Sequence, residues 1–260
     1  MKKILAAVLT VVLLVSALVS CGQGSDVEYV KENKKLVVGV TVYEPMDYIG
    51  EDGEWTGFDA ELAKMFADSL GVNCQIVIID WNNKVAELKS KQIDLVWNGM
   101  TASDELGEQI DFSVSYAKNA QVAVAKKGSS VTKDNIKDAT VAVENGSAGE
   151  NVVRETIKAT KIVEKSDGQV GALSEVLAGT SDVAVIDLTM AQSVVGKGEY
   201  ADLVILDGAS YGEEIFAVGL RPGSDLKGEL DAFLKAKYAD GTMAKLLEKY
   251  PVVLNEDALK

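Results

Sequence analysis

The chain has 260 residues, of which 47% are hydrophobic and only 3 are proline, so it can form one large domain or two small ones around a sizeable core. Its 40 acidic and 26 basic residues give a formal net charge of −14, which argues against nucleic acid as a partner because no basic stripe can displace counterions. The chain has no histidine, the most common general base and transition-metal ligand, so zinc and serine-triad catalysis are disfavoured and no cofactor is expected.

The N-terminus has the charged and apolar regions of a secretory signal. An apolar run follows Lys2 and Lys3, and Cys21 comes directly after its small-residue end, in the pattern of a bacterial lipoprotein signal. We expect cleavage before Cys21, a lipid on its thiol, and a mature chain anchored to the extracellular face of the cell membrane. A plain membrane anchor is the alternative, but the run is shorter than the roughly 20 residues of a spanning helix. The segments assigned here are a signal peptide, 1–20, and a polar lipid tether, 21–35.

Strands then alternate with helices. The expected elements are a strand over 36–42 that leads to Tyr43, a turn at 51–54, a helix from Gly57 to Gly71, a strand over 75–79, and a short helix with Val85 and Leu88. This alternation predicts a parallel sheet with right-handed crossovers. Cys74 has no intramolecular partner if Cys21 carries a lipid, so we expect it to be a buried, inert thiol.

The next segment, 93–116, reads as strand, bend and helix. A short apolar strand ends at Asn98-Gly99, and the acidic residues from Asp104 to Glu108 form a helical turn. In an open α/β sheet, small ligands are received at the carboxyl ends of the strands. We therefore expect a binding site near Gly99.

The pattern restarts after Tyr116 and forms a second α/β unit. The expected elements are strands over 121–125 and 140–143, a glycine-rich turn over 144–149 that opens a helix, a helical face over 170–177, and a strand over 182–187 that ends on Asp187. The chain crosses back near 211–214, forms one more strand over 215–220, and ends in helices, the first of them capped by Asp225.

Two segments resemble the extracellular solute-binding proteins of polar amino-acid ABC transporters, family 3, which have the type II periplasmic-binding-protein fold. The family pattern D-A-I-x-x-G-M-T-x-T-x-E-R-x-x-x-x-D-F-S-x-P-Y is matched by Asp94, Gly99, Met100, Thr101, Ser103, Glu105, Asp111, Phe112, Ser113 and Tyr116. The C-terminal pattern A-D-G-T-x-x-K-I-x-x-K-Y/W is similar to residues 239–250. The resemblance extends over nearly all of the chain after the signal.

The resemblance implies a two-lobed α/β clamshell that clamps a small molecule. Each lobe is expected to be a mainly parallel sheet flanked by helices, with two hinge crossovers near 116–121 and 211–214. The implied division is 36–117 with 215–260 for lobe 1, and 118–214 for lobe 2.

In the first lobe the resemblance assigns two aromatic ligand contacts, Tyr43 and Trp81. Their alternatives are a half-buried turn residue near Pro45 and a lid over the sheet edge, respectively. Gly99 and Thr101 occupy positions that hydrogen-bond the ligand's head group, with Asn98 and Met100 beside them. Leu106 stands where the family has the arginine that binds the ligand's α-carboxylate.

In the second lobe, Ser147 and Ala148 fall in the family's G-T-T turn, whose second threonine also meets the carboxylate at a helix N-terminus. Here that threonine is Ala148, so two members of the carboxylate clamp are missing together. Asp187 keeps the family's acidic residue that pairs with the ligand's α-ammonium. Its alternative role is to cap the helix that follows.

Two accounts fit a lost carboxylate clamp with a retained aspartate. The ligand is an amine or another polar molecule without an α-carboxylate, or it is an amino acid whose carboxylate meets backbone N–H groups or a lysine such as Lys84 or Lys118. Losing a bidentate arginine costs several kcal/mol, so the first account is slightly favoured and amino acids remain the family default.

The expected function is to capture a small polar solute, an amino acid or related amine, and to deliver it to the permease of an ABC transporter. The protein is expected to be a monomer and not an enzyme. Alternatives are the same fold with a small carboxylate or nucleoside as ligand, a dehydratase-like enzyme, or a sensory input domain. Leu106 and the missing histidine disfavour the enzyme, and the end of the chain at Lys260 disfavours the sensor.

Overall fold

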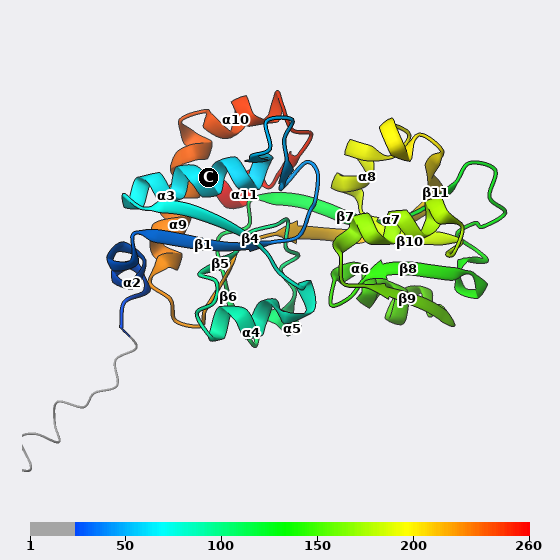
Figure 1. Cartoon of the computed structure of the whole chain (residues 1–260), viewed down its shortest axis with the longest axis horizontal. Coiled ribbons are helices and arrows are strands. Elements are labelled where there is room, and N and C mark those ends of the chain that lie inside the picture. The colour runs from blue at the N-terminus through cyan, green and yellow to red at the C-terminus, as the bar shows by residue number, and fades with distance from the viewer. Residues whose placement is uncertain (1–23) are drawn as a thin grey trace, which may run out of the picture.

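Figure 1 shows the computed structural model of the chain, which describes residues 24–260. The helices α2 to α5 and α9 to α11 gather around one sheet, and α6 to α8 gather around another, so the protein has two α/β lobes. The expected signal peptide and Cys21 lie outside the described residues. Within residues 24–260, none of the helices combines the length and the apolar character that a membrane crossing requires.

The first lobe is built on a five-stranded sheet in the order β4-β1-β5-β12-β6. Its strands are β1 (Lys35–Val40), β4 (Asn73–Ile78), β5 (Leu95–Val96), β6 (Asp111–Phe112) and β12 (Gly219–Leu220). The β1 strand pairs in parallel with β4 and β5, as the strand–helix alternation predicts, and β12 adds antiparallel pairs with β5 and β6. The remaining elements are α2 (Asp26–Asn33), β2 (Tyr48–Ile49), β3 (Trp55–Thr56), α3 (Phe58–Leu70), η1 (Trp81–Asn83), α4 (Lys84–Lys89), α5 (Asp104–Gly107), α9 (Leu226–Ala239), α10 (Thr242–Leu247) and α11 (Glu256–Leu259).

The second lobe is built on a sheet in the order β11-β7-β10-β8-β9. Its strands β9 (Lys161–Lys165), β8 (Thr140–Glu144) and β10 (Val183–Asp187) pair in parallel, with β9 at the edge. The elements around it are η2 (Ile136–Asp138), α6 (Ala148–Asn151), η3 (Val152–Ile157), α7 (Gly168–Ala178), α8 (Leu188–Val194) and η4 (Gly198–Tyr200).

Two long strands connect the lobes. The strands β7 (Ala117–Lys126) and β11 (Leu203–Phe216) pair antiparallel along their length, and β13 (Val253–Leu254) adds to β7. Register shifts interrupt the β7–β11 pairing between Ile205 and Ser210 and between Tyr211 and Glu214. The expected hinge segments therefore lie on paired strands, and bending at them stays a prediction.

Helix α3 illustrates how the sequence pattern forms the core of the first lobe. Phe58, Leu62 and Phe66 lie on its buried face, and Gly71 ends it in the left-handed conformation that favours glycine. The Trp97 ring is fully buried and packs edge-on against the rings of Phe66 and Tyr116, with both centroids 6.4 Å away. Trp97 therefore belongs to the core.

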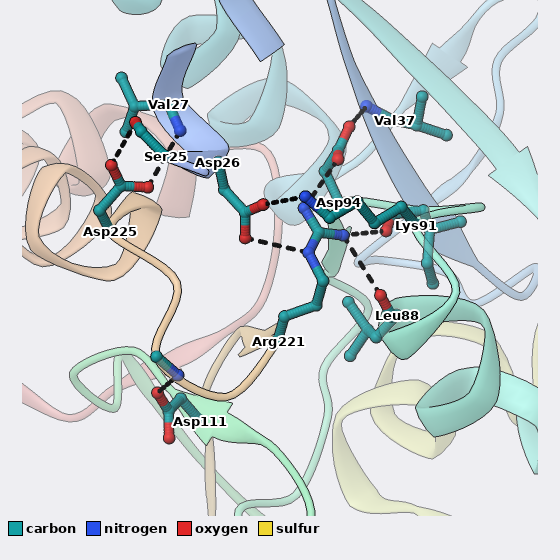
Figure 2. Close-up of polar contacts among 12 residues, drawn as sticks. Ser25, Asp26, Val27, Val37, Leu88, Lys91, Asp94, Asp111, Arg221 and Asp225 are labelled. Atoms are coloured by element: carbon teal, nitrogen blue, oxygen red, sulfur yellow. Dashed lines mark hydrogen bonds and ion pairs between the residues drawn. The ribbon is translucent and has the colours of Figure 1, made fainter. Parts of the chain in front are cut away.

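The segment expected to be a tether is mostly folded, which corrects that assignment. Residues 26–33 form helix α2, which begins at the N-cap Ser25 and buries Val30 against the first lobe. The helix is held there by Arg221, whose guanidinium contacts Asp26 at 3.0 Å and Asp94 at 3.1 Å, as Figure 2 shows. Such a contact across 195 residues leaves no local trace in the composition of 21–35.

The carboxylate of Asp225 also differs from its expected role. It lies at the N-cap position of α9 but makes no side-chain capping hydrogen bond there. Instead it accepts hydrogen bonds from the Ser25 hydroxyl at 2.5 Å and from the backbone N–H of Val27 at 3.0 Å, so it anchors the start of α2 (Figure 2). A carboxylate at a helix start also suits the positive end of the helix dipole.

Candidate ligand-binding site

A cavity between the lobes contains about 540 Å³ of empty space, including the solvent at its mouth. The first lobe contributes the lining residues Tyr43, Trp81, Asn98, Gly99, Met100, Thr101, Ser103 and Leu106. The second lobe and β7 contribute Gln121, Glu144, Ser147, Ala148, Gly149, Asn151, Gln169, Val185 and Asp187. All ten residues predicted as ligand contacts thus line one cavity, and their binding of a ligand stays a prediction.

The cavity lies where parallel strands end. Tyr43 follows β1, Trp81 follows β4, and Gly99 follows β5, while Glu144 and Asp187 are the last residues of β8 and β10. At these ends the strands stop pairing, so side chains and backbone groups project into the space between the lobes.

Two aromatic side chains form one wall. Tyr43 is 2% exposed and Trp81 7% exposed, and both line the cavity. Gly99, with a φ of 55°, lies so close to the Tyr43 ring that a Cβ there would be 2.8 Å from the ring's Cε1 atom. A side chain at position 99 would therefore displace the Tyr43 ring, so glycine at this position leaves the room that the ring needs.

The polar groups of Asn98 and Gly99 are already used within the first lobe. The Asn98 amide accepts from the backbone N–H and hydroxyl of Thr41, and it donates to the Thr41 carbonyl and to Asp47. The Gly99 N–H donates to Asp59 Oδ2 at 2.7 Å. These two residues line the cavity, and their contact with a ligand stays a prediction, but the Asn98 amide and the Gly99 N–H also support the fold.

Thr101 connects the first lobe to the crossing strand β11. Its hydroxyl donates to Glu214 Oε2 at 2.9 Å, and the amides of Asn119 and Gln121 donate to the same oxygen at 3.1 Å and 2.9 Å. The Thr101 hydroxyl can still accept a hydrogen bond from a ligand.

The Asp187 carboxylate is buried and surrounded by amide donors. Gln121 donates to Asp187 Oδ1 at 2.6 Å, and Asn119 and Gln169 donate to its two oxygens. It makes no capping hydrogen bond to helix α8, so the alternative role as a cap is not found. Burial raises the pKa of Asp187 to about 7, the charge of Glu214 adds to this, and the amide hydrogen bonds oppose it.

Glu144 is a second buried carboxylate of the cavity, and the sequence analysis did not single it out. It is 3% exposed, and its Oε1 atom has no hydrogen-bond partner among residues 24–260. Burial raises the pKa of Glu144 to about 8, and the charge of Asp187 raises it further, against the Thr41 hydrogen bond and the charge of Lys84. Glu144, like Asp187, is the last residue of a strand, and this position could have identified it as a candidate. The sequence analysis instead placed Glu144 in the turn over 144–149.

No lysine or arginine of residues 24–260 lines the cavity. Leu106 and Ala148 line it where the family has carboxylate-binding side chains, and Ser147 caps helix α6 by accepting from the Glu150 N–H. Lys118, one of two lysines considered as a substitute, is exposed on β7.

Lys84, the other lysine, is buried but directed elsewhere. Its ammonium donates to the carbonyls of Trp81 at 3.1 Å and Gly146 at 2.8 Å, and it lies 5.0 Å from the centroid of the Trp81 ring. The Gly146 contact crosses from one lobe to the other. Burial lowers the pKa of Lys84 to about 8, against the charges of Glu144, Asp80 and Glu150. Lys84 therefore holds the lobes together behind Trp81.

Comparison with known proteins gives consistent matches. The family described as bacterial extracellular solute-binding proteins, family 3, matches residues 36–252. The L-cystine-binding protein TcyJ of Escherichia coli strain K12 is 32% identical over 227 residues, 85% of this chain and 84% of that protein. The arginine-binding extracellular protein ArtP of Bacillus subtilis strain 168 is 30% identical over 237 residues, 90% and 92% of the two chains. A solved ABC uptake transporter substrate binding protein from Streptococcus pneumoniae with bound histidine has a TM-score of 0.80 at 29% identity, with 88% of this chain and 97% of that chain covered.

Proposed function

Because the chain belongs to family 3 of the bacterial extracellular solute-binding proteins, we propose that it captures a small polar solute, an amino acid or related amine, and delivers it to an ABC transporter permease. The relatives are named as binding proteins for amino acids, and members of the family bind substrates for ABC transport. The protein is a receptor in this proposal, and the ligand leaves it unchanged.

The observation that carries the proposal is the single cavity lined by strand ends of both lobes. A ligand that touches Tyr43 and Trp81 on one side and Asp187 on the other stabilises the arrangement in which the lobes meet. The lobes are close together around the cavity, since a Cβ at Gly146 of the second lobe would lie 2.9 Å from the Cα of Asn82 in the first. Release to the permease then requires the lobes to separate about β7 and β11.

We also propose that a lipid on Cys21 anchors the mature protein to the extracellular face of the cell membrane. The Cys21 thiol lies only a few residues before helix α2, which is fixed to the first lobe by Arg221 and Asp225. The first lobe is therefore held near the membrane by a short link. Metabolic labelling with a fatty-acid probe tests this, with Cys21→Ala as the unlabelled control.

Small-angle scattering and Trp fluorescence with a panel of amino acids, amines, nucleosides and small carboxylates test the transport-receptor proposal. We expect at least one ligand to compact the protein, to bind with one-to-one stoichiometry, and to be recovered unchanged. The fluorescence change should be absent in Trp81→Phe, while Trp55→Phe, outside the cavity, keeps it. A panel in which no compound at millimolar concentration binds or compacts the protein contradicts the proposal.

A further inference from the structure

We propose that the cavity selects a small molecule with two separate nitrogen cations and no carboxylate, one cation bound at Asp187 and the other at Glu144. This inference rests on the proposed function and names the class of substrate for that same cavity. Glu144 is the specificity-determining residue, because it offers a second carboxylate for a second cation, whereas Asp187 alone can bind one cation.

The strongest observation is the unpaired buried oxygen of Glu144. The residue is 3% exposed and lines the cavity, yet its Oε1 atom has no hydrogen-bond partner in the described chain. Buried polar atoms are normally paired, so an unpaired carboxylate oxygen on a residue that lines the cavity indicates that a ligand supplies its partner.

The charges in and around the cavity favour a cation. Glu144 and Asp187 line it, and Glu214 lies next to Asp187 through the amides of Gln121 and Asn119. Asp167 also acts on Glu144 through its charge, and Lys84 is the cation that opposes these acids. A buried carboxylate is stable in its ionised form only beside a cation or strong donors. Burial is the main cause of the raised pKa values of both cavity acids, and the charge of a neighbouring acid adds to it in each case.

The same charges disfavour a ligand carboxylate. An α-amino acid bound through its ammonium at Asp187 would bring a further negative charge between two acids, with Leu106 and Ala148 in place of the residues that neutralise it. A ligand without that carboxylate avoids the repulsion.

The different surroundings of the two acids favour two nitrogen groups over one. Glu144 and Asp187 end the adjacent parallel strands β8 and β10. Three amides already donate to Asp187, whereas Glu144 Oε1 is buried without a hydrogen-bond partner among residues 24–260, so the two carboxylates offer distinct sites. The stem between the nitrogen groups can pack on the rings of Tyr43 and Trp81.

Calorimetry at pH 8 with three related compounds tests the inference. Agmatine has an amine and a guanidinium, L-arginine adds a carboxylate to that skeleton, and butylguanidine lacks the second cation. We expect agmatine to bind at least about tenfold more tightly than either of the others, since each charge-assisted hydrogen bond is strong. Tighter binding of L-arginine, or equal binding of butylguanidine, overturns the inference while the transport-receptor proposal stands. If no member of the wider panel binds, the proposed function itself fails.

Matched variants identify the role of Glu144. Glu144→Gln keeps the shape but loses the charge, and we expect it to weaken agmatine binding about tenfold or more while butylguanidine changes little. Glu155→Gln removes the same charge from an exposed position of the same lobe and should leave both affinities unchanged. Equal loss for both compounds in Glu144→Gln, or no loss for agmatine, contradicts the assignment. If Glu144→Gln does not fold, the three-compound comparison on the unmodified protein decides.

Discussion

Two of the groups of buried carboxylates among residues 24–260 differ in whether the chain supplies their cation. Asp26 and Asp94, at the base of the first lobe, both contact Arg221, and the three side chains are 4–8% exposed (Figure 2). Asp187 and Glu144 in the cavity are just as buried, but no lysine or arginine of the described chain lines the space that they share.

Asp26 and the two cavity acids have pKa shifts of opposite sign. Burial opposes ionisation of Asp26, but hydrogen bonds from Arg221 and Lys91 outweigh it and the pKa of Asp26 is lowered. Burial dominates in the cavity and raises the pKa of Asp187 to about 7 and of Glu144 to about 8. The comparison teaches that an internal cation keeps a buried carboxylate ionised within the fold, whereas burial without one favours the protonated form; our proposal is that in the cavity an external cation takes the place of that proton.

Removal of Arg221 should have the largest effect. Arg221→Met leaves Asp26 and Asp94 buried without a cation, and we expect the free energy of unfolding to fall by about 3–5 kcal/mol. Urea denaturation measures this. Arg154→Met, which breaks an exposed ion pair with Glu150, is the control and should leave the midpoint nearly unchanged. If the two variants are equally stable, the Arg221 cluster does not hold α2 and the first lobe together.

The cavity acids should make the unliganded protein less stable as pH rises. Glu144 has a folded pKa of about 8 against an ordinary value of 4.5, so between these values the native state binds more protons than the unfolded state. Stability then decreases with increasing pH, by up to about 1.4 kcal/mol per pH unit for one such group. Asp26 acts in the opposite direction, because its lowered pKa adds stability that is lost only in acid.

Urea denaturation of the unliganded protein between pH 5 and 9 measures this dependence. Asp47 and Asp59 are also buried with raised pKa values, so the informative quantity is the difference between the unmodified protein and Glu144→Gln. The variant should lose stability less steeply with pH. Identical slopes would mean that Glu144 carries no extra proton in the native state.

Leu106→Arg should make the cavity resemble the cluster around Arg221, because it supplies a cation from within the chain. We expect α-amino acids such as L-arginine to gain about 10–100-fold in affinity, because a bidentate hydrogen-bonded cation meets their carboxylate. Agmatine should lose affinity through repulsion. Calorimetry on Leu106→Arg and on the apolar control Leu106→Met tests this, and no gain for any α-amino acid would mean that the guanidinium at 106 does not reach the ligand.

Ala148→Thr should have the smallest effect. It restores one neutral hydroxyl donor at the start of α6, which gains less from the ligand's carboxylate than the paired N–H groups of a guanidinium do, so we expect α-amino acids to gain about tenfold in affinity or less. The gain should be clear in the Leu106→Arg background, where the carboxylate is already held. Ala148→Val, similar in shape and without the hydroxyl, is the control, and an equal gain with it would rule out a hydrogen bond.

The sequence predicted the fold and most of the cavity because their signals are local. Strand–helix alternation predicted the strands whose ends meet at the cavity, and the family resemblance assigned Tyr43, Trp81, Gly99 and Asp187, all of which line it. The rule that ligand contacts lie at strand ends would have identified Glu144 at the end of Thr140–Glu144. The glycine-rich sequence of 144–149 instead led to its assignment to the turn.

The misses came from pairings distant in the chain. Helix α2 looks polar in isolation, and its folding depends on Arg221 and Asp225, about 200 residues away. The sequence did not show that the Asn98 amide donates to Asp47 or that the Gly99 N–H donates to Asp59, while ligand contact at these two residues stays a prediction. No periodicity or motif records such tertiary partners.

The proton balance of binding tests the central claim most directly. If the cavity acids hold protons until an external cation replaces them, agmatine binding at pH 7 should release roughly one proton per site, chiefly from Glu144 with its pKa of about 8. Calorimetric titrations in buffers of different ionisation enthalpy measure this number. Release near one proton that is clearly smaller in Glu144→Gln, where Asp187 is the remaining source, supports the account, and binding with no release or with proton uptake contradicts it.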